Sequence, residues 1–151
     1  MISYRKSISI LLKNKIKISD EYILSKNSSC RICAKNIYSP SNYPSSNNTA
    51  FDGFAINSKE TDKLSKKNYR KFKIIKTIAA GDNPNIKKIK KFSTIEVMTG
   101  AIIKKPFDTV IPVEKVKFFP NKKNPKYILI EKKIKKNEHI RFLGSDYKKG
   151  E

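Results

Sequence analysis

The stretch that decides the fold is FKIIKTIA at residues 72–79, in which β-branched and aromatic residues partly alternate with lysines. Similar short runs occur at 54–56, 94–98, 109–113 and 127–130, and clusters of Gly, Pro, Asn or Lys bound the later ones. Several short β runs at close spacing, separated by turn-forming residues, are typical of a small barrel or sandwich. We therefore expect the middle of the chain to form one.

The residues before this stretch predict a helix followed by short strands. Apolar side chains recur at helical spacing between residues 3 and 15, with lysines between them, which predicts an amphipathic helix. The positions that carry this pattern are Tyr4, Ile8, Leu11 and Leu12. We also expect strands at 21–24 and 31–37, a loop rich in Ser, Pro and Asn at 38–48, and an exposed polar connection at 58–71.

Taken together, these patterns predict a β-rich α+β fold. A chain of 151 residues is long enough for one compact domain or for two small ones that share a modest core. We expect a small β-barrel-like domain at residues 43–135. It would be inserted in a discontinuous domain of residues 1–42 and 136–151, which holds the helix and the short strands.

The charge of the chain leaves two interpretations open. A net charge of +21 is typical of a nucleic-acid-binding protein. However, the chain has 30 lysines and four arginines, and nucleic-acid recognition favours the forked guanidinium of arginine. Lysine, isoleucine and asparagine are the residues that AT-rich codons encode, so nucleotide bias explains the basicity better. The alternative is a basic barrel that stacks bases on aromatic residues among lysines, namely Phe118, Phe119, Tyr127 and Phe142.

The two cysteines predict neither a disulfide framework nor a zinc site. Cys30 and Cys33 have CxxC spacing, but zinc needs four ligands and the only histidine is His139. We expect both thiols to be buried in a strand around Ser29 to Ala34, as small apolar groups. No apolar run reaches the length of a membrane span, and residues 1–15 lack the features of a secretion signal. A cytoplasmic protein is therefore expected.

Three short polar motifs have side chains and backbone suited to anion or cation handling. Asp52-Gly53 sets a carboxylate beside a residue without Cβ, and Thr99-Gly100-Ala101 ends a β run with a hydroxyl and a flexible amide. Gly144-Ser145-Asp146 adds a second carboxylate. Taken alone, each motif is typical of an ordinary turn.

Four segments, in order and at compatible spacing, resemble the MoeA and gephyrin E-domain family. Asn47 to Ala55 (NNTAFDGFA) is similar to the family's D-N-S-A-M-D-G-Y-A, and Ile78 to Asp82 (IAAGD) is similar to I-A-A-G-D. Val97 to Ala101 (VMTGA), followed by Asp108 to Glu114 (DTVIPVE), resembles I-M-T-G-A and D-A-V-V-P-V-E. His139-Ile140-Arg141 with Gly144-Ser145-Asp146 and Gly150 resembles N-I-R-R-x-G-E-D-I-x-x-G. Four matches in register are a much stronger signal than any one of them.

This resemblance implies insertion of molybdate into adenylated molybdopterin with release of AMP, assisted by a divalent cation, Mg²⁺. It implies catalytic roles for Asp52, Thr99 and Asp146, and leaves the metal ligands unassigned. It also implies that a second set of residues binds the anionic substrates: Asn48, Thr49, Gly53, Gly100 and Ala101.

The chain also departs from the family pattern. Ser145 replaces a glutamate beside Asp146, Asn47 replaces an aspartate, and Ile102 and Lys104 stand where prolines are usual. Nothing matches the family's pterin-binding α/β domain or its C-terminal β domain. The resemblance implies a homodimer in which the pocket lies between one subunit's α/β domain and the partner's barrel. We therefore expect a truncated molybdotransferase carrying one pocket wall, with a non-catalytic dimerisation or scaffold fragment as an alternative.

Overall fold

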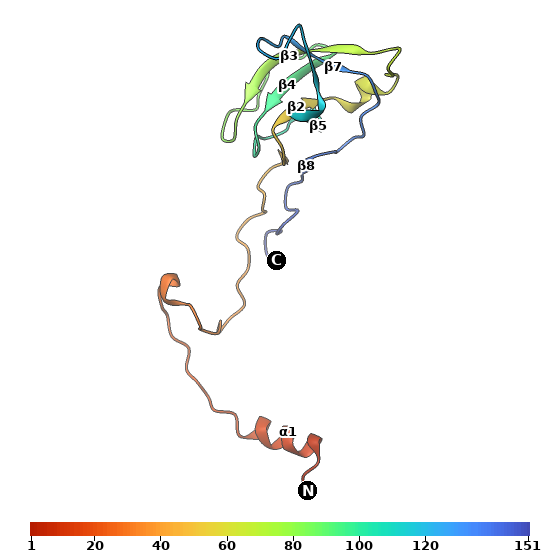
Figure 1. The fold of residues 1–151 in the computed structure, drawn as a ribbon. Helices are drawn as coiled ribbons and strands as arrows, with labels where there is room; N and C mark the ends of the chain where they lie inside the picture. Colours follow the sequence, from red (N-terminus) through yellow and green to blue (C-terminus); the bar gives the residue numbers. More distant parts are fainter. The chain divides into compact units, whose positions relative to one another are not determined.

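The computed structural model describes residues 1–151, and the chain divides into two compact units, Met1–Ile37 and Tyr38–Glu151. Figure 1 shows the single α-helix in the first unit and the strands in the second. That helix is too short and too polar to cross a membrane.

The first unit holds the helix that the apolar spacing predicts. α1 runs over Tyr4–Lys13 and begins at Ser3, whose hydroxyl caps it by accepting a hydrogen bond from the Lys6 amide. It ends at Asn14, whose amide bonds the carbonyls of Ile10 and Leu11. No residue of α1 is buried, so its apolar face is exposed. A short 3₁₀ turn, η1, follows at Ser25–Asn27.

The strands expected at 21–24 and 31–37 do not form, and the expectation for the cysteines is wrong. Cys30 and Cys33 are both exposed, and Cys30 has a φ of +62°. A strand needs a neighbour to accept its backbone hydrogen bonds, and neither sheet of the structure includes residues 21–24 or 31–37. The ion pair between Arg31 and Glu21, 2.7 Å long, is exposed and holds no core around the thiols.

The second unit is built on a six-stranded sheet in the order β5-β2-β4-β3-β7-β6. All neighbours in this sheet are antiparallel except β3 and β4, which run parallel. Its strands are β2 (Gly53–Ile56), β3 (Arg70–Ile78), β4 (Ser93–Val97), β5 (Thr109–Pro112), β6 (Lys117–Phe119) and β7 (Tyr127–Ile130). The sheet curls into a half-barrel, which confirms the β-rich α+β class (Figure 1).

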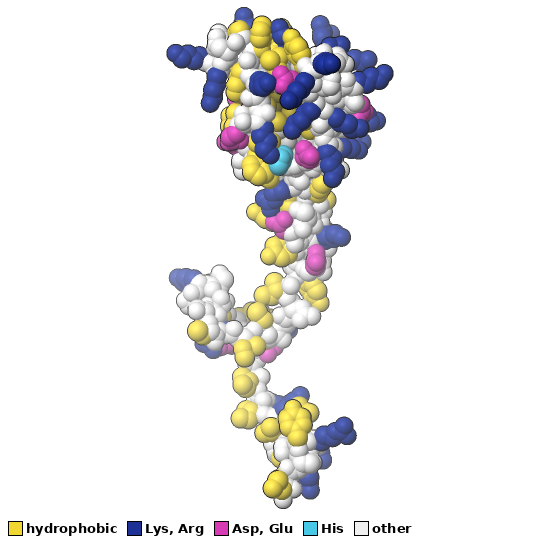
Figure 2. Space-filling model, turned by 45° about the vertical axis from the view of Figure 1, so that its right-hand side comes forward, with side chains coloured by type: hydrophobic (Ala, Val, Ile, Leu, Met, Phe, Trp, Pro, Cys, Tyr) yellow, Lys and Arg dark blue, Asp and Glu magenta, His cyan; other side chains and the backbone are white.

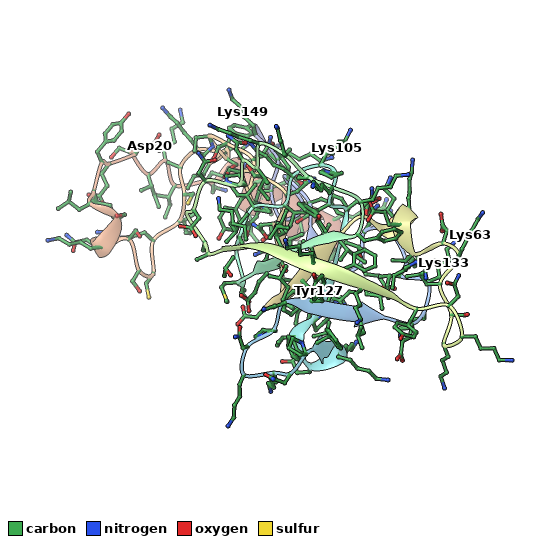
Figure 3. All side chains as sticks on the ribbon, turned by 90° about the horizontal axis from the view of Figure 1, so that it is seen from above. Asp20, Lys63, Lys105, Tyr127, Lys133 and Lys149 are labelled. Atoms are coloured by element: carbon green, nitrogen blue, oxygen red, sulfur yellow. The ribbon has the colours of Figure 1, made fainter.

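Seen from above, β7 lies beside β3, with Tyr127 at one end of β7 and Lys133 beyond the other (Figure 3). In the sheet, β6 lies on the other side of β7 from β3. The predicted runs at 54–56, 72–79, 94–98, 109–113 and 127–130 are all confirmed as strands, with bounds that agree or differ by one or two residues.

Hydrophobic side chains pack on both faces of the sheet. Ala55 belongs to one buried cluster, while its neighbours Phe54 and Ile56 belong to the other, as alternation along a strand requires. Every residue of β2 is therefore buried. The first cluster also includes Ala101, Ile103 and Phe107, from the segment that connects β4 to β5.

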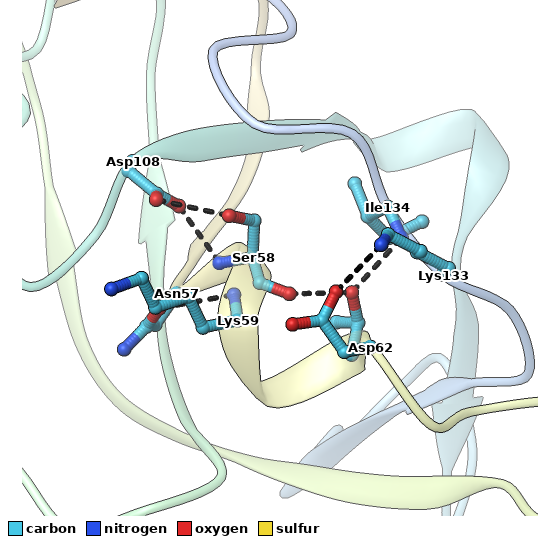
Figure 4. Close-up of polar contacts among 8 residues, drawn as sticks. Asn57, Ser58, Lys59, Asp62, Asp108, Lys133 and Ile134 are labelled. Atoms are coloured by element: carbon cyan, nitrogen blue, oxygen red, sulfur yellow. Dashed lines mark hydrogen bonds and ion pairs between the residues drawn. The ribbon is translucent and has the colours of Figure 1, made fainter.

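The expected exposed connection at 58–71 is wrong for its first turn. This turn, η2 (Ser58–Thr61), carries two buried hydroxyls, and Figure 4 shows the bonds around them. The amide and hydroxyl of Ser58 donate to the Asp108 carboxylate at 2.7 and 2.9 Å. The Thr61 hydroxyl donates to the Ser58 carbonyl at 2.7 Å and accepts from the Ile134 amide at 2.9 Å. η2 thereby joins β5 to the segment that follows β7.

The ends of the second unit form a narrow antiparallel ribbon. β1 (Asn48–Thr49) pairs with β8 (Ile140–Arg141), so that Thr49 lies opposite Ile140. Farther out, the Tyr43 amide donates to the Tyr147 carbonyl at 2.8 Å. A domain boundary between residues 42 and 43, with residues 1–42 and 136–151 forming one domain, remains a prediction.

Candidate functional site

Asp52 and Thr99 lie in direct contact, although 47 residues separate them in sequence. Asp52 lies just before β2 and Thr99 lies two residues after β4, and the register pairs Gly53 with Val97. The strand pairing therefore brings the two turns to the same edge. One oxygen of Asp52, Oδ1, accepts hydrogen bonds from the Thr99 amide at 2.6 Å and from the Thr99 hydroxyl at 2.8 Å.

These bonds hold Asp52 in its charged form. The backbone bond from Thr99, and then the hydroxyl bond, lower the pKa of Asp52 below its ordinary value, and partial desolvation opposes them. The carboxylate is therefore a weak base at neutral pH. Its second oxygen, Oδ2, takes no hydrogen bond from the protein, and the side chain is exposed. Such a group is suited to binding a cation or a donor on a ligand.

The turn after β4 is held against β1 by two backbone bonds. The Gly100 amide donates to the Thr49 carbonyl, and the Thr49 amide donates to the Ala101 carbonyl, both at 3.0 Å. Gly100 has a φ of +85°, a conformation that favours glycine. The Thr49 hydroxyl is buried and engaged with the backbone of Phe51. In the structure, Thr49, Gly100 and Ala101 therefore form the frame around Asp52 and Thr99.

Strand packing alone explains why residue 53 is glycine. A Cβ on Gly53 would lie 2.1 Å from the backbone carbonyl oxygen of Ile111 on β5. This close approach of β2 and β5 leaves no room for any side chain, whether or not a ligand approaches the turn.

Asn48 carries a buried amide oxygen, Oδ1, that has no hydrogen-bond partner. A buried polar atom in this state costs about 1–3 kcal/mol relative to a satisfied one. Asn48 lies on β1 directly opposite Arg141 on β8. An unsatisfied acceptor beside the candidate site is a place where a donor on a ligand or a partner chain would be favoured.

Asp146 follows β8 and forms no hydrogen bond or ion pair with Asp52 or Thr99. Its Oδ2 accepts a hydrogen bond from Arg141 Nη2 at 2.5 Å, and its Oδ1 accepts from the Ser145 hydroxyl at 3.0 Å. The Arg141–Asp146 pair is the feature that sequence reasoning missed. The five-residue spacing across a Gly-containing turn was the available signal for it.

The carboxylates do not form a metal cage by themselves. Nowhere in the chain do three or more His, Cys, Asp or Glu side chains come together in a group that could hold a metal ion. Of the two predicted catalytic carboxylates, Asp52 has a free oxygen, whereas both oxygens of Asp146 are engaged within the chain.

Comparison with known proteins identifies the family. Residues 2–151 match the family model described as MoeA N-terminal region (domain I and II). The molybdopterin molybdenumtransferase of Haemophilus influenzae is 32% identical over 131 residues, which cover 87% of this chain and 30% of that protein. The Staphylococcus epidermidis protein of the same name is 29% identical over 150 residues, covering 99% of this chain and 34% of its own length.

A solved structure shows the same fold. The molybdopterin biosynthesis moeA protein of Pyrococcus horikoshii matches with a TM-score of 0.84 and 28% identity, covering 100% of this chain and 38% of the other. The chain spans about a third of the length of the curated relatives it matches. With a family model that matches nearly every residue and a shared fold, the chain belongs to the family of MoeA N-terminal regions.

Proposed function

We propose that this chain supplies one wall of the pocket in which molybdate is inserted into adenylated molybdopterin, with release of AMP. The observation that carries the proposal is the Asp52–Thr99 contact, which fixes an ionised, exposed carboxylate at the end of two strands. Catalysis by positioning requires groups held in one geometry, and a shift of about 1 Å can cost roughly 10²-fold in rate.

The residues present fit a role for Mg²⁺ in this reaction. Mg²⁺ is commonly held by one or two carboxylates together with substrate phosphates and water. The free oxygen of Asp52 is one such ligand, and the phosphates of the substrate would supply others. Mg²⁺ would supply charge neutralisation. The lowered pKa of Asp52 favours a ligand role over proton transfer.

The remaining predicted residues have supporting roles in this proposal. Thr99 orients Asp52, while Gly100, Ala101 and Thr49 hold the turn in place. Asn48 would offer its unpaired oxygen to a substrate donor. Asp146 would act through Arg141, keeping the guanidinium oriented along the ribbon.

Homodimerisation and a cytoplasmic location belong to the same proposal. The exposed apolar face of α1 supports a protein contact there. The location rests on the biosynthetic role of the family alone.

The test is an insertion assay with the isolated chain and with the remaining domains of a relative added in trans. We expect no turnover by the chain alone and turnover after the addition, because the chain supplies only one wall. Asp52→Asn should then lower kcat by roughly 10²-fold, by analogy with the loss of other charge-stabilising groups. The matched control is Asp20→Asn, an exposed carboxylate in the first unit, which should leave kcat unchanged.

Turnover by residues 1–151 alone would contradict the one-wall proposal. Full activity of Asp52→Asn in the reconstituted enzyme would contradict the role of Asp52.

A further inference from the structure

The two edge strands of the half-barrel, β5 and β6, do not pair with each other, and a cleft lies between them. We call it the seam cleft. β5 and β6 are the two edge strands of the sheet, yet residues of both line one cavity of about 680 Å³. The short turn η3 (Val113–Lys115) connects the two strands at one end. The segment at 131–139 borders the cleft as well. Curling of the sheet therefore brings its edges to opposite sides of the same hollow.

The cleft combines apolar side chains with a group of cations. Its apolar lining includes Ile111, Val116, Leu129 and Ile134. Six lysines also line it, namely Lys66, Lys115, Lys117, Lys132, Lys133 and Lys135. Figure 2 shows this kind of surface, with lysines in dark blue around hydrophobic side chains and the single histidine, in cyan, below them.

Most of these lysines have no acidic partner. Lys117 pairs with Glu131 at 2.9 Å, and Lys133 pairs with Asp62 at 2.8 Å. The other four lysines, Lys66, Lys115, Lys132 and Lys135, form no ion pair, and Glu138 is the one further carboxylate in the lining. The cleft therefore has an excess of positive charge that an anionic ligand would neutralise.

The lysine content of the whole chain does not account for this cluster. Lysines make up six of the 16 lining residues, against 30 of 151 in the whole sequence. The cleft is thus enriched in lysine about twofold beyond the composition that nucleotide bias would produce.

We propose that the seam cleft binds a small organic phosphate, with its apolar part on the floor and its phosphate among the lysines. This proposal does not rest on the molybdenum-insertion proposal. Small-molecule sites have volumes of roughly 300–1,000 Å³. This cleft falls in that range and sets seven apolar residues beside its six lysines. Lysine binds phosphate as a point charge and needs no planar geometry.

A nucleic-acid strand fits the cleft less well. Single-stranded nucleic acid is held by stacking successive bases on aromatic side chains. The aromatic pair of exposed Phe119 and half-buried Tyr127 does not line the cleft, where His139 is the only aromatic ring. A compact phosphate ester needs no such platform.

The test is calorimetric titration of the full 151-residue chain with 1-naphthyl phosphate, with the neutral 1-naphthol as the comparison ligand. We expect 1-naphthyl phosphate to bind. The backbone amide NMR signals of the protein that shift on binding should belong to residues 110–117 and 129–139. The double variant Lys115→Glu/Lys135→Glu, which changes both walls, should weaken binding by roughly tenfold or more. The control Lys87→Glu/Lys122→Glu has the same net charge and lies outside the cleft, so it should stay within about twofold.

Equal weakening by both double variants would overturn the proposal, because binding would then follow net charge alone. Shifts that map outside the cleft, or binding of a single-stranded oligonucleotide with none of 1-naphthyl phosphate, would also overturn it. If the Lys→Glu pair does not fold, as judged by circular dichroism, Lys115→Gln/Lys135→Gln provides the same test with a smaller charge change.

Discussion

The Asp52 carboxylate links the candidate site to stability. Its pKa is lowered in the folded state, so its bonds from Thr99 stabilise the fold above the ordinary pKa, and this contribution is lost as the pH falls through the lowered value. We expect Asp52→Asn to lower the urea midpoint at pH 7, and the difference from the unmodified chain to shrink below about pH 4. Asp20→Asn, which removes an exposed carboxylate of the first unit, is the control for the loss of one negative charge. A difference that stays constant from pH 7 to pH 3 would contradict the assignment.

Residue 53 must be glycine because the backbone of β5 lies too close for a Cβ. Substitutions at Gly53 and Gly81 distinguish the cost of this contact from the cost of a strained backbone conformation. Gly53→Ala places a methyl group 2.1 Å from the Ile111 carbonyl oxygen, and neither strand can move freely. We expect a loss of about 2–3 kcal/mol in unfolding free energy, as for overpacking. Gly81→Ala, at a φ of +88° with open space around it, should cost only about 1 kcal/mol. Equal costs in denaturant titrations would show that the contact with β5 is not limiting.

At the level of elements, η2 depends on one buried hydroxyl. Thr61→Val keeps the shape of the side chain but leaves the Ile134 amide without its acceptor and the Ser58 carbonyl without its donor. Unsatisfied buried groups cost about 1–3 kcal/mol, and we expect a loss in this range by urea unfolding. The control is Thr77→Val, which removes an exposed bond to Glu96 and should cost less than about 0.5 kcal/mol. A neutral Thr61→Val would show that η2 is held by packing alone.

The strands that could be predicted from the sequence are the longer ones. β2, β3, β4, β5 and β7 have four to nine residues each, enough for apolar runs and turn residues to indicate them. β1 and β8, with two residues each, are too short to show any period. The two false strands before residue 38 have suitable composition but no partner, and pairing is a tertiary property that local pattern does not carry.

The candidate site was predictable only in part, for a related reason. The Asp52–Thr99 contact followed from a resemblance of separate segments, and the register of β2 and β4 explains it. The engagement of Asp146 by Arg141, and the unpaired oxygen of Asn48, depend on the geometry of the β1–β8 ribbon. No pattern of residue types specifies which side chain is buried there without a partner.

For the whole molecule, the exposed apolar face of α1 predicts self-association. Ile8, Leu11 and Leu12 lie on one side of the helix and are 38%, 67% and 56% exposed. Apolar surface of this kind favours contact with other chains. We expect sedimentation velocity to show concentration-dependent association, which Leu11→Ser/Leu12→Ser reduces. Lys13→Ser, on the same helix, should leave it unchanged, and association that persists in the Leu variant would locate the contact elsewhere.

The antiparallel ribbon at the ends of the second unit affects how such a unit can be joined to other polypeptide segments. The Ser39 amide donates to the Glu151 carbonyl, and the Gly150 amide donates to the Ser39 carbonyl, both at 2.9 Å, so entry and exit lie side by side. A folded unit whose ends meet can be inserted at a single surface point of another chain without stretching its host. Because the two strands of the ribbon are held together here, we expect the half-barrel to keep its fold when sequence is added or removed outside the ribbon.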